Sequence, residues 1–176
     1  MFSPRHCGPT LLDQCEGLPE DLTAAPVATD PVLAIAEADT IITVSGATFN
    51  IGGDAAFYSP VHDFVQVPPQ AAYHEPINWY RTALHELGHW TGHTSRLDRD
   101  QKGTFGSQPY AREELVAELA AAFTCASLGI APTVRHSDYV ASWLTVLRED
   151  DKAIFRAASA ASKAADYLLN LKGEAP

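Results

Sequence analysis

Two histidines separated by three residues most constrain how this chain can fold. They are His85 and His89 in the segment His85-Glu86-Leu87-Gly88-His89. Side chains four positions apart lie on one face of an α-helix, so both imidazoles can reach a single ion if this segment is helical. Glu86 then leans over the same side, where a carboxylate can take a proton from water. The spacing predicts a metal-binding helix, with zinc as the expected ion and Glu86 as the general base.

The residues before the two histidines support a helix. Pro76 suits a first helical turn, and the apolar residues Trp79, Ala83, Leu87 and Trp90 recur at spacings of three and four. A chance H-E-x-x-H is expected in roughly one or two per hundred chains of this composition, so the flanking pattern has to support the motif. We expect this apolar stripe to face a core while the histidines line a cleft.

A catalytic zinc usually has three protein ligands and one open position. The candidates for the third ligand are His93, Ser95 and the acids of the next predicted helix. His93 lies a further turn along, where a helix surface drifts away from a point ion. Glu114 and Glu118 share one helix face, so one can bind the ion while the other accepts the N–H of a ligating histidine. We expect Glu113 to be a solvated acid of the first turn.

Three parts of the chain are expected: an extended, proline-containing lead-in over residues 1–30, a single domain over residues 31–171, and a tail over residues 172–176. Within the domain, a short helix is predicted over 31–39. Helices are also predicted from Pro76, from about Tyr110 to Gly129, over Ser137–Glu149, and over Lys152–Leu171.

The β-branched and aromatic residues between 40 and 67 predict four short strands, at 40–44, 47–51, 55–58 and 64–67. Gly52-Gly53-Asp54 between the second and third of them is a hairpin signal. The expected fold is therefore α+β, with a small antiparallel sheet packed on a helical base and the histidine helix lining the cleft between them.

Charge and composition exclude several classes of function. The chain has 176 residues, 22 acidic and 12 basic side chains and a net charge of −10, which opposes direct binding to DNA phosphates. No apolar run is long enough to cross a bilayer, and the first residues do not resemble a secretory signal. The three cysteines form no C-x-x-C pair. We therefore expect a cytoplasmic protein with no membrane partner.

Two stretches resemble a known family. They are His85-Glu-Leu-Gly-His-Trp-Thr-Gly-His with Ser95-Arg-Leu, and Tyr110-Ala-Arg-Glu-Glu-Leu-Val-Ala-Glu-Leu. Both are similar to the zincin-like metallopeptidase domain of ArdC-type plasmid antirestriction proteins, and the resemblance extends over about residues 13–171. It implies a zincin-like fold, and we expect the chain to lack the N-terminal single-stranded-DNA-binding domain of that family. Ser95 stands where metzincins have a third histidine, which argues against that class.

The resemblance also assigns roles. It implies that His85, His89 and Glu114 bind the metal, that Glu86 is the general base, and that Glu118 supports a ligand from behind. The leading hypothesis is a zinc-dependent peptidase that acts on a peptide or protein substrate in an antirestriction or mobile-element context. The alternative is a non-catalytic, metal-stabilised module that protects DNA by contacting a restriction-modification enzyme. A third hypothesis is a remnant with no DNA-directed task.

A peptidase also needs a group that stabilises the developing oxyanion. Spacing leaves four candidates open: Tyr58, Tyr110, His136 and Tyr139.

Overall fold

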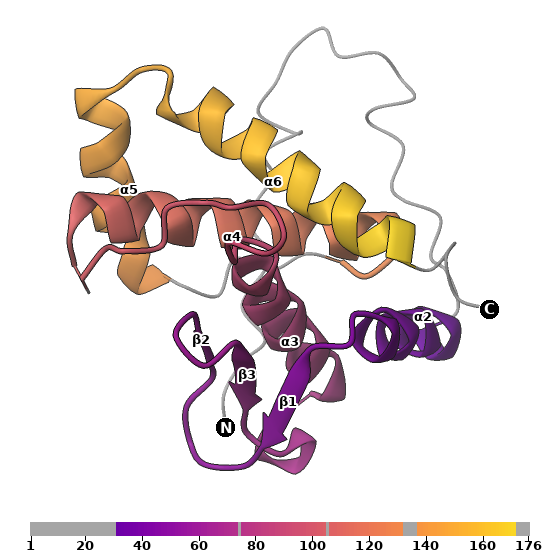
Figure 1. The fold of residues 1–176 in the computed structure, drawn as a ribbon. Helices are drawn as coiled ribbons and strands as arrows, with labels where there is room; N and C mark the ends of the chain where they lie inside the picture. Colours follow the sequence, from indigo (N-terminus) through magenta and orange to yellow (C-terminus); the bar gives the residue numbers. More distant parts are fainter. Residues whose placement is uncertain (1–30, 74, 105, 132–136, 172–176) are drawn as a thin grey trace, which may run out of the picture.

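The computed structural model describes residues 31–73, 75–104, 106–131 and 137–171 (Figure 1). The expected lead-in and tail lie outside these ranges. In chain order the elements are α2 (Pro31–Val44), β1 (Thr48–Ile51), β2 (Phe57–Ser59), β3 (Phe64–Val67), the 3-10 turn η2 (Gln70–Ala72), α3 (Pro76–Trp90), α4 (Gln108–Ser127), α5 (Ser137–Glu149) and α6 (Ala153–Asn170). No helix in the described ranges is long and apolar enough to span a membrane.

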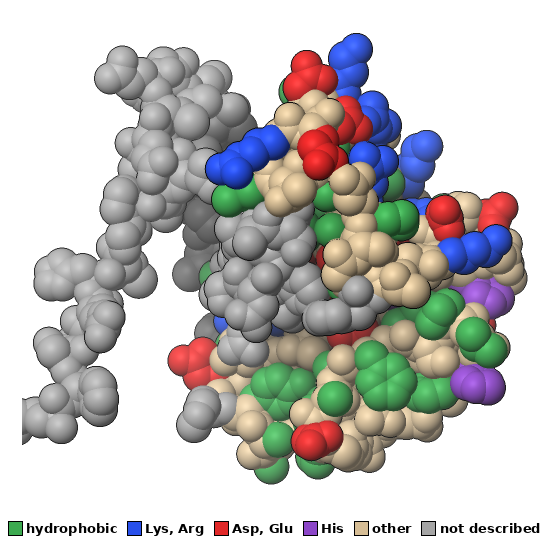
Figure 2. Space-filling view, turned by 90° about the vertical axis from the view of Figure 1, so that its left-hand side faces the viewer, with side chains coloured by type: hydrophobic (Ala, Val, Ile, Leu, Met, Phe, Trp, Pro, Cys, Tyr) green, Lys and Arg blue, Asp and Glu red, His purple; other side chains and the backbone are tan. Residues whose placement is uncertain are grey.

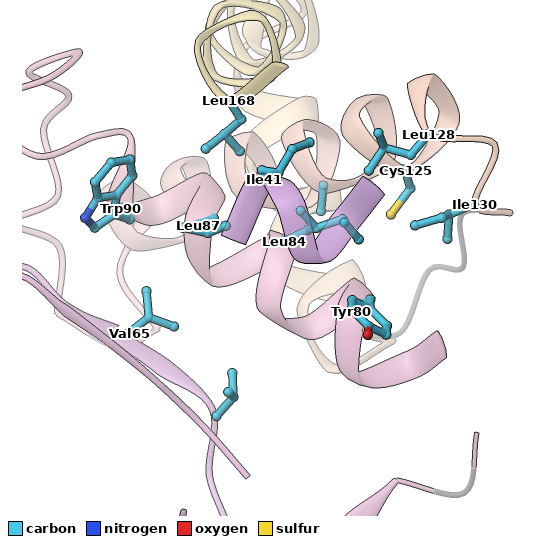
Figure 3. Close-up of a cluster of buried hydrophobic side chains, with 13 residues drawn as sticks. Ile41, Val65, Tyr80, Leu84, Leu87, Trp90, Cys125, Leu128, Ile130 and Leu168 are labelled. Atoms are coloured by element: carbon cyan, nitrogen blue, oxygen red, sulfur yellow. The ribbon is translucent and has the colours of Figure 1, made fainter. Parts of the chain in front are cut away.

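Helix α3, which carries the two histidines, is the centre of one hydrophobic core. It begins at Pro76, the start that the sequence predicts, and ends at Trp90. Leu84 and Leu87 are fully buried, and the core around them includes Ile41 of α2 and Leu168 of α6 (Figure 3). The apolar stripe of α3 packs against other elements, and residues of its polar face, His85, Glu86 and His89, line a cavity.

Helix α4 contributes residues to two hydrophobic cores in the described part of the structure. The hydroxyl of Ser107 caps its first turn by accepting a hydrogen bond from the Tyr110 N–H at 3.4 Å. One side of α4 packs on α3 and the other side contributes to a second core with α5 and α6. At the crossing with α3, a Cβ on Gly88 would lie 3.2 Å from the carbonyl oxygen of Ala117. The glycine therefore allows a close approach, which sets the histidines of α3 opposite the acids of α4.

The three strands form a mixed sheet in the order β1-β3-β2, below the helices in Figure 1. Strand β2 is antiparallel to β3, but β1 is parallel to β3, so the prediction of a purely antiparallel sheet was wrong. Val65 and Val67 of β3 are fully buried, so β3 takes the centre and the two less buried strands take the edges. The Gly52-Gly53-Asp54 turn therefore joins two strands that both pair with β3, and it closes no hairpin between them.

The predicted strand at residues 40–44 is instead the second half of α2. Ile41 is fully buried in the core beside α3, and this packing outweighs the strand propensity of the β-branched residues around it. The hydroxyls of Thr40 and Thr43 donate to the carbonyl oxygens four residues back, at 2.9 Å and 2.8 Å. The helix thus satisfies the polar groups of its threonines, and the short helix predicted over 31–39 continues to Val44.

Candidate metal centre

The structure brings together three side chains that can share one ion: His85 and His89 of α3 and Glu114 of α4. The Nε2 atom of His85 lies 3.5 Å from one carboxylate oxygen of Glu114, and the Nε2 atom of His89 lies 3.5 Å from the other. All three residues are at most 9 % exposed. The three potential ligand atoms lie within 4.8 Å of one another.

The spacing of these atoms fits a small divalent cation. Ligand bonds of 2.0–2.1 Å in a tetrahedral arrangement place neighbouring ligand atoms about 3.4 Å apart. Each histidine has one Glu114 oxygen at 3.5 Å, close to this value, although the two oxygens differ, and one ligand atom from each of the three residues lies within 4.8 Å of the others. The two imidazole planes lie at 82° to each other, so their Nε2 atoms approach the shared carboxylate from different directions. These residues could therefore hold an ion without rearranging the helices.

Each histidine also has a second carboxylate close to its Nδ1 atom. The Nδ1 atom of His85 lies 3.1 Å from Glu118, the residue predicted to support a ligand, and the Nδ1 atom of His89 lies 3.2 Å from Glu113. An ionised carboxylate only accepts hydrogen bonds, so each neutral imidazole would carry its proton on Nδ1. The lone pair of each Nε2 would then face the centre of the cluster, as metal binding requires.

The prediction that Glu113 is a solvated acid was wrong. Glu113 is 8 % exposed and accepts hydrogen bonds from Arg99 at 2.8 Å and 3.1 Å and from Gln101 at 3.1 Å. Both donors belong to the loop between α3 and α4, which folds back over this carboxylate. Helix periodicity could not reveal this contact, because it depends on the path of a loop. The one usable signal is the arginine itself, since a buried acid needs a cationic partner.

The ionisation of the cluster follows from its acids. Burial alone would lower the pKa of both histidines, but hydrogen bonds to Glu114 and Glu118 raise the pKa of His85 to about 9. Hydrogen bonds to Glu113 and Glu114 likewise raise the pKa of His89 to about 10. Burial would raise the pKa of Glu113, yet His89 and Arg99 lower it to about 2.

The pKa of Glu114 responds in the same way. Burial opposes its ionisation, but hydrogen bonds from both ligating histidines hold its pKa far below the ordinary value. The cluster therefore favours positive charge at its centre, whether as protons on the imidazoles or as a cation.

The metal cluster opens into a cavity of about 300 Å³. His85, His89, Glu86 and Glu114 lie along its helical side, and Glu86 is itself buried. Residues of β2 and its neighbours, Ala56, Phe57, Tyr58 and Pro60, also line the cavity. Figure 2 shows hydrophobic side chains gathered on the lower, sheet-bearing half of the molecule. This arrangement places a carboxylate next to a cation site in a cleft that a peptide could enter.

The candidates for oxyanion stabilisation are placed differently. Tyr58 and Tyr110 both line the cavity. The hydroxyl of Tyr58 already donates to Asp63 at 2.8 Å, and burial together with this hydrogen bond raises its pKa. His136 lies outside the described residues, as does the side chain of Tyr139.

The structure places two candidates for the third ligand outside the cluster. The Nδ1 atom of His93 lies 2.8 Å from the hydroxyl of Ser95, and both residues follow the end of α3.

The profile of the zincin-like metallopeptidase family matches residues 36–160 of the chain. The chain belongs to this family. Two solved structures are similar to it, both of the antirestriction ArdC protein from the R388 plasmid. The Mn(II)-bound structure superposes with a TM-score of 0.73 at 38 % identity and covers 92 % of this chain and 60 % of the ArdC chain. The metal-free structure has a TM-score of 0.70 at 39 % identity, with 93 % and 59 % covered. The ArdC-type, zincin-like α+β fold expected from the sequence is thus confirmed.

Sequence relatives place the same domain in larger proteins. The DNA primase TraC of Escherichia coli is 48 % identical over 138 residues, which are 77 % of this chain and 13 % of TraC. The uncharacterized protein y4eC of Sinorhizobium fredii (strain NBRC 101917 / NGR234) is 43 % identical over 144 residues, 78 % of this chain and 47 % of y4eC. The chain therefore spans less than half the length of these two relatives.

Proposed function

We propose that this zincin-like domain is a divalent-metal-dependent peptidase that hydrolyses peptide bonds in a peptide or protein substrate. The observation that carries the proposal is the convergence of two Nε2 atoms and one carboxylate in a cavity that Glu86 and the apolar residues Ala56, Phe57 and Pro60 also line. Two imidazoles and a carboxylate are a ligand set that zinc commonly takes. The Mn(II)-bound structure of the ArdC relative supports a divalent ion, and zinc remains our proposed ion.

In the proposed mechanism, His85, His89 and Glu114 hold the ion, and Glu113 and Glu118 keep the imidazoles oriented. When bound, such an ion acts as a Lewis acid that makes water more acidic and polarises a carbonyl group. Glu86 takes a proton from the attacking water and delivers it to the leaving amine. The apolar side of the cavity contacts the side chains of the substrate, and Tyr110 is a candidate hydrogen-bond donor to the oxyanion.

The test of this mechanism is the Glu86→Gln variant, assayed with wild type on a library of internally quenched peptides after loading with zinc or manganese. General acid-base catalysis contributes roughly 10²–10⁴-fold, so we expect turnover to fall by at least about 100-fold. Metal content measured by plasma mass spectrometry should stay at the wild-type level, since Glu86 is not a proposed ligand. Wild-type rates in the metal-loaded variant would remove Glu86 from the mechanism.

A second function is supported by the name of the solved relative, an antirestriction protein. In this alternative the metal stabilises a non-catalytic module that contacts a restriction-modification enzyme and so protects mobile DNA. A restriction assay in cells separates the two: protection that survives Glu86→Gln supports the module, and protection lost with hydrolysis supports the peptidase. Both functions would operate in the cytoplasm. Given the net charge of −10, neither relies on direct DNA binding by this domain.

A further inference from the structure

We propose that Arg99, Gln101 and Glu113 form one positioning unit, here called the His89 clamp, that sets metal affinity by fixing His89 in its ligand geometry. The proposal rests on the metal site proposed above, but it does not depend on hydrolysis. It further states that the clamp matters more for metal affinity than Glu118, which lies behind the other histidine.

The first step of the argument is the pairing of Arg99 with Glu113. The guanidinium donates from Nε to one carboxylate oxygen at 3.1 Å and from Nη2 to the other at 2.8 Å. This two-point geometry fixes the plane of the carboxylate as well as its position. The oxygen that receives the Nη2 bond is also the one 3.2 Å from Nδ1 of His89. Arg99 therefore determines where the acceptor for His89 lies.

The second step is that the clamp also holds the backbone of α3. Arg99 donates to the carbonyl oxygen of Gly88 at 2.6 Å and to the hydroxyl of Thr91 at 2.8 Å, while Gln101 donates to the carbonyl oxygen of His89 at 2.7 Å. The carbonyls of a final helical turn lack partners within their own helix. The N–H of Gly92 also donates to the His89 carbonyl at 2.8 Å and the hydroxyl of Thr91 to the Gly88 carbonyl at 2.7 Å, and Arg99 and Gln101 add side-chain donors to the same two carbonyls. The clamp therefore contacts the side chain of His89, through Glu113, and the backbone of the last turn of α3.

The third step is the space that the clamp requires. A Cβ on Gly92 would lie 2.7 Å from both Nη2 of Arg99 and Nε2 of Gln101. That distance is too short for a real contact, and the atoms met are the ends of the two donor side chains, so an alanine at position 92 would displace these donors from their present positions. Gly92 is thus a residue whose substitution should disturb the clamp without touching Glu113 itself.

The fourth step is the contrast between the two outer carboxylates. The Glu118 side chain is more exposed than the Glu113 side chain, 15 % against 9 %, so water competes more for its contact with a histidine. Arg99 holds the Glu113 carboxylate at two points, by hydrogen bonds from Nε and Nη2. Removing Arg99 would release this carboxylate from the position in which it faces Nδ1 of His89, so the ligand geometry of His89 should be lost with it.

The experiment measures the affinity of the metal-free chain for zinc by competition with a chromophoric chelator, and records the visible absorption of the cobalt(II)-loaded chain. Loss of a partner behind a ligating histidine typically weakens metal binding 10–100-fold. We expect Glu113→Ala to fall in that range with a changed cobalt spectrum, and Glu113→Gln, which keeps an acceptor oxygen, to remain within a few-fold of wild type. The matched control Glu118→Ala should lose less affinity than Glu113→Ala.

A second pair of variants keeps the test decisive if single substitutions disturb folding. Arg99→Met should weaken zinc binding, and the double variant Arg99→Met/Glu113→Ala should bind zinc within a few-fold of Glu113→Ala alone, because Arg99 acts through Glu113. Gly92→Ala should show the same cobalt spectral change as Arg99→Met. Circular dichroism of each metal-free variant checks that the fold is retained.

Three results would overturn the proposal: Glu113→Ala with wild-type zinc affinity and cobalt spectrum, a loss in Glu118→Ala equal to or greater than that in Glu113→Ala, or a double variant in which the fold-losses of Arg99→Met and Glu113→Ala multiply in full. Failure of the proposed peptidase looks different. Wild type would then bind zinc with the clamp dependence described and still cleave no peptide. A wild-type chain that binds no metal would remove both proposals.

Discussion

The helical side of the cleft is buried and charged, whereas the sheet side is apolar and partly exposed. His85, His89 and Glu114 are held by α3 and α4 at the contact between two cores, and their polar atoms face partners on neighbouring elements. On the sheet side, Phe57 is 41 % exposed and lies against the ring of Phe64. A metal site needs ligand positions fixed within fractions of an ångström, while a surface that receives a substrate can tolerate some adjustment. We infer that the helical side holds the metal ligands rigidly, whereas the sheet side can adjust to a substrate.

Two arginines of the same loop serve the two sides. Arg99 turns inward to Glu113, and Arg96 turns towards the sheet, where it forms an ion pair with Asp63 and contacts the hydroxyl of Tyr58 at 3.3 Å. The guanidinium of Arg96 also lies 3.8 Å from the centre of the Trp90 ring at the end of α3. The loop after the metal helix therefore couples the sheet to the same helix end that carries His89.

The largest expected effect is a difference between the two sides in their contribution to the free energy of unfolding. Leu84 is fully buried on α3, so Leu84→Ala should lower the free energy of unfolding by about 2–5 kcal/mol. The matched substitution on the sheet side, Phe57→Ala, removes a partly exposed ring and should cost less. Urea unfolding followed by circular dichroism measures both. Equal losses would show that the sheet side is as much a part of the core as α3.

The next effect separates the two arginines. Arg96→Ala removes an ion pair, a ring contact and a hydrogen bond to the Trp90 carbonyl at 2.6 Å, and should lower the free energy of unfolding by about 1–2 kcal/mol. It should leave zinc affinity near the wild-type value, unlike Arg99→Met. Calorimetric unfolding and chelator competition on both variants form the test. A large loss of zinc affinity in Arg96→Ala would mean that the two sides are not separable.

A smaller effect concerns substrate contact. Once a cleaved peptide is found, Phe57→Ala should raise KM several-fold and leave kcat nearly unchanged, because the ring lines the cavity and is neither a proposed metal ligand nor the proposed base. Steady-state kinetics on that peptide gives both constants. Metal content serves as the control and should not change. A fall in kcat with an unchanged KM would place Phe57 among the residues that act on the transition state.

The smallest effect is the pH dependence of stability that arises from the ion pair between Arg96 and Asp63. Hydrogen bonds from Arg96 lower the pKa of Asp63 despite its partial burial. A depressed carboxyl pKa stabilises the fold above the unfolded pKa of about 4, and this stabilisation is lost as pH falls through the folded value. The melting temperatures of wild type and Asp63→Asn should therefore differ most near pH 7 and converge below about pH 4. A difference that grows at acid pH would contradict the assignment.

The sequence predicts the helical side better than the sheet side, and the reason is the range of the interactions. Pro76, Ser107 and the spacing of His85 and His89 are local signals, so the starts of α3 and α4 and the shared face of the histidines follow from neighbours in the chain. The pairing of β1 with β3 is set by the burial of Val65, which local patterns do not reveal. Burial in the core likewise keeps residues 40–44 in α2.

The residues of the candidate site also differ in whether the sequence could predict their positions. The approach of Glu114 and Glu118 to the histidines could be anticipated from helix periodicity together with the family resemblance. The burial of Glu113 could not, because Arg99 reaches it from a loop whose path depends on Gly92 and on the packing of α3 against α4. Residues that depend on loop contacts are therefore the ones that periodicity misplaces.

The most direct test of the central claim is the metal content of purified wild type and of Glu114→Ala, measured by plasma mass spectrometry after incubation with zinc or manganese and removal of unbound ion. We expect about one ion per wild-type chain and a marked loss in Glu114→Ala, because the variant removes the carboxylate that faces both Nε2 atoms. A wild-type chain without metal, or a Glu114→Ala variant with the full wild-type content, would contradict the three-ligand site.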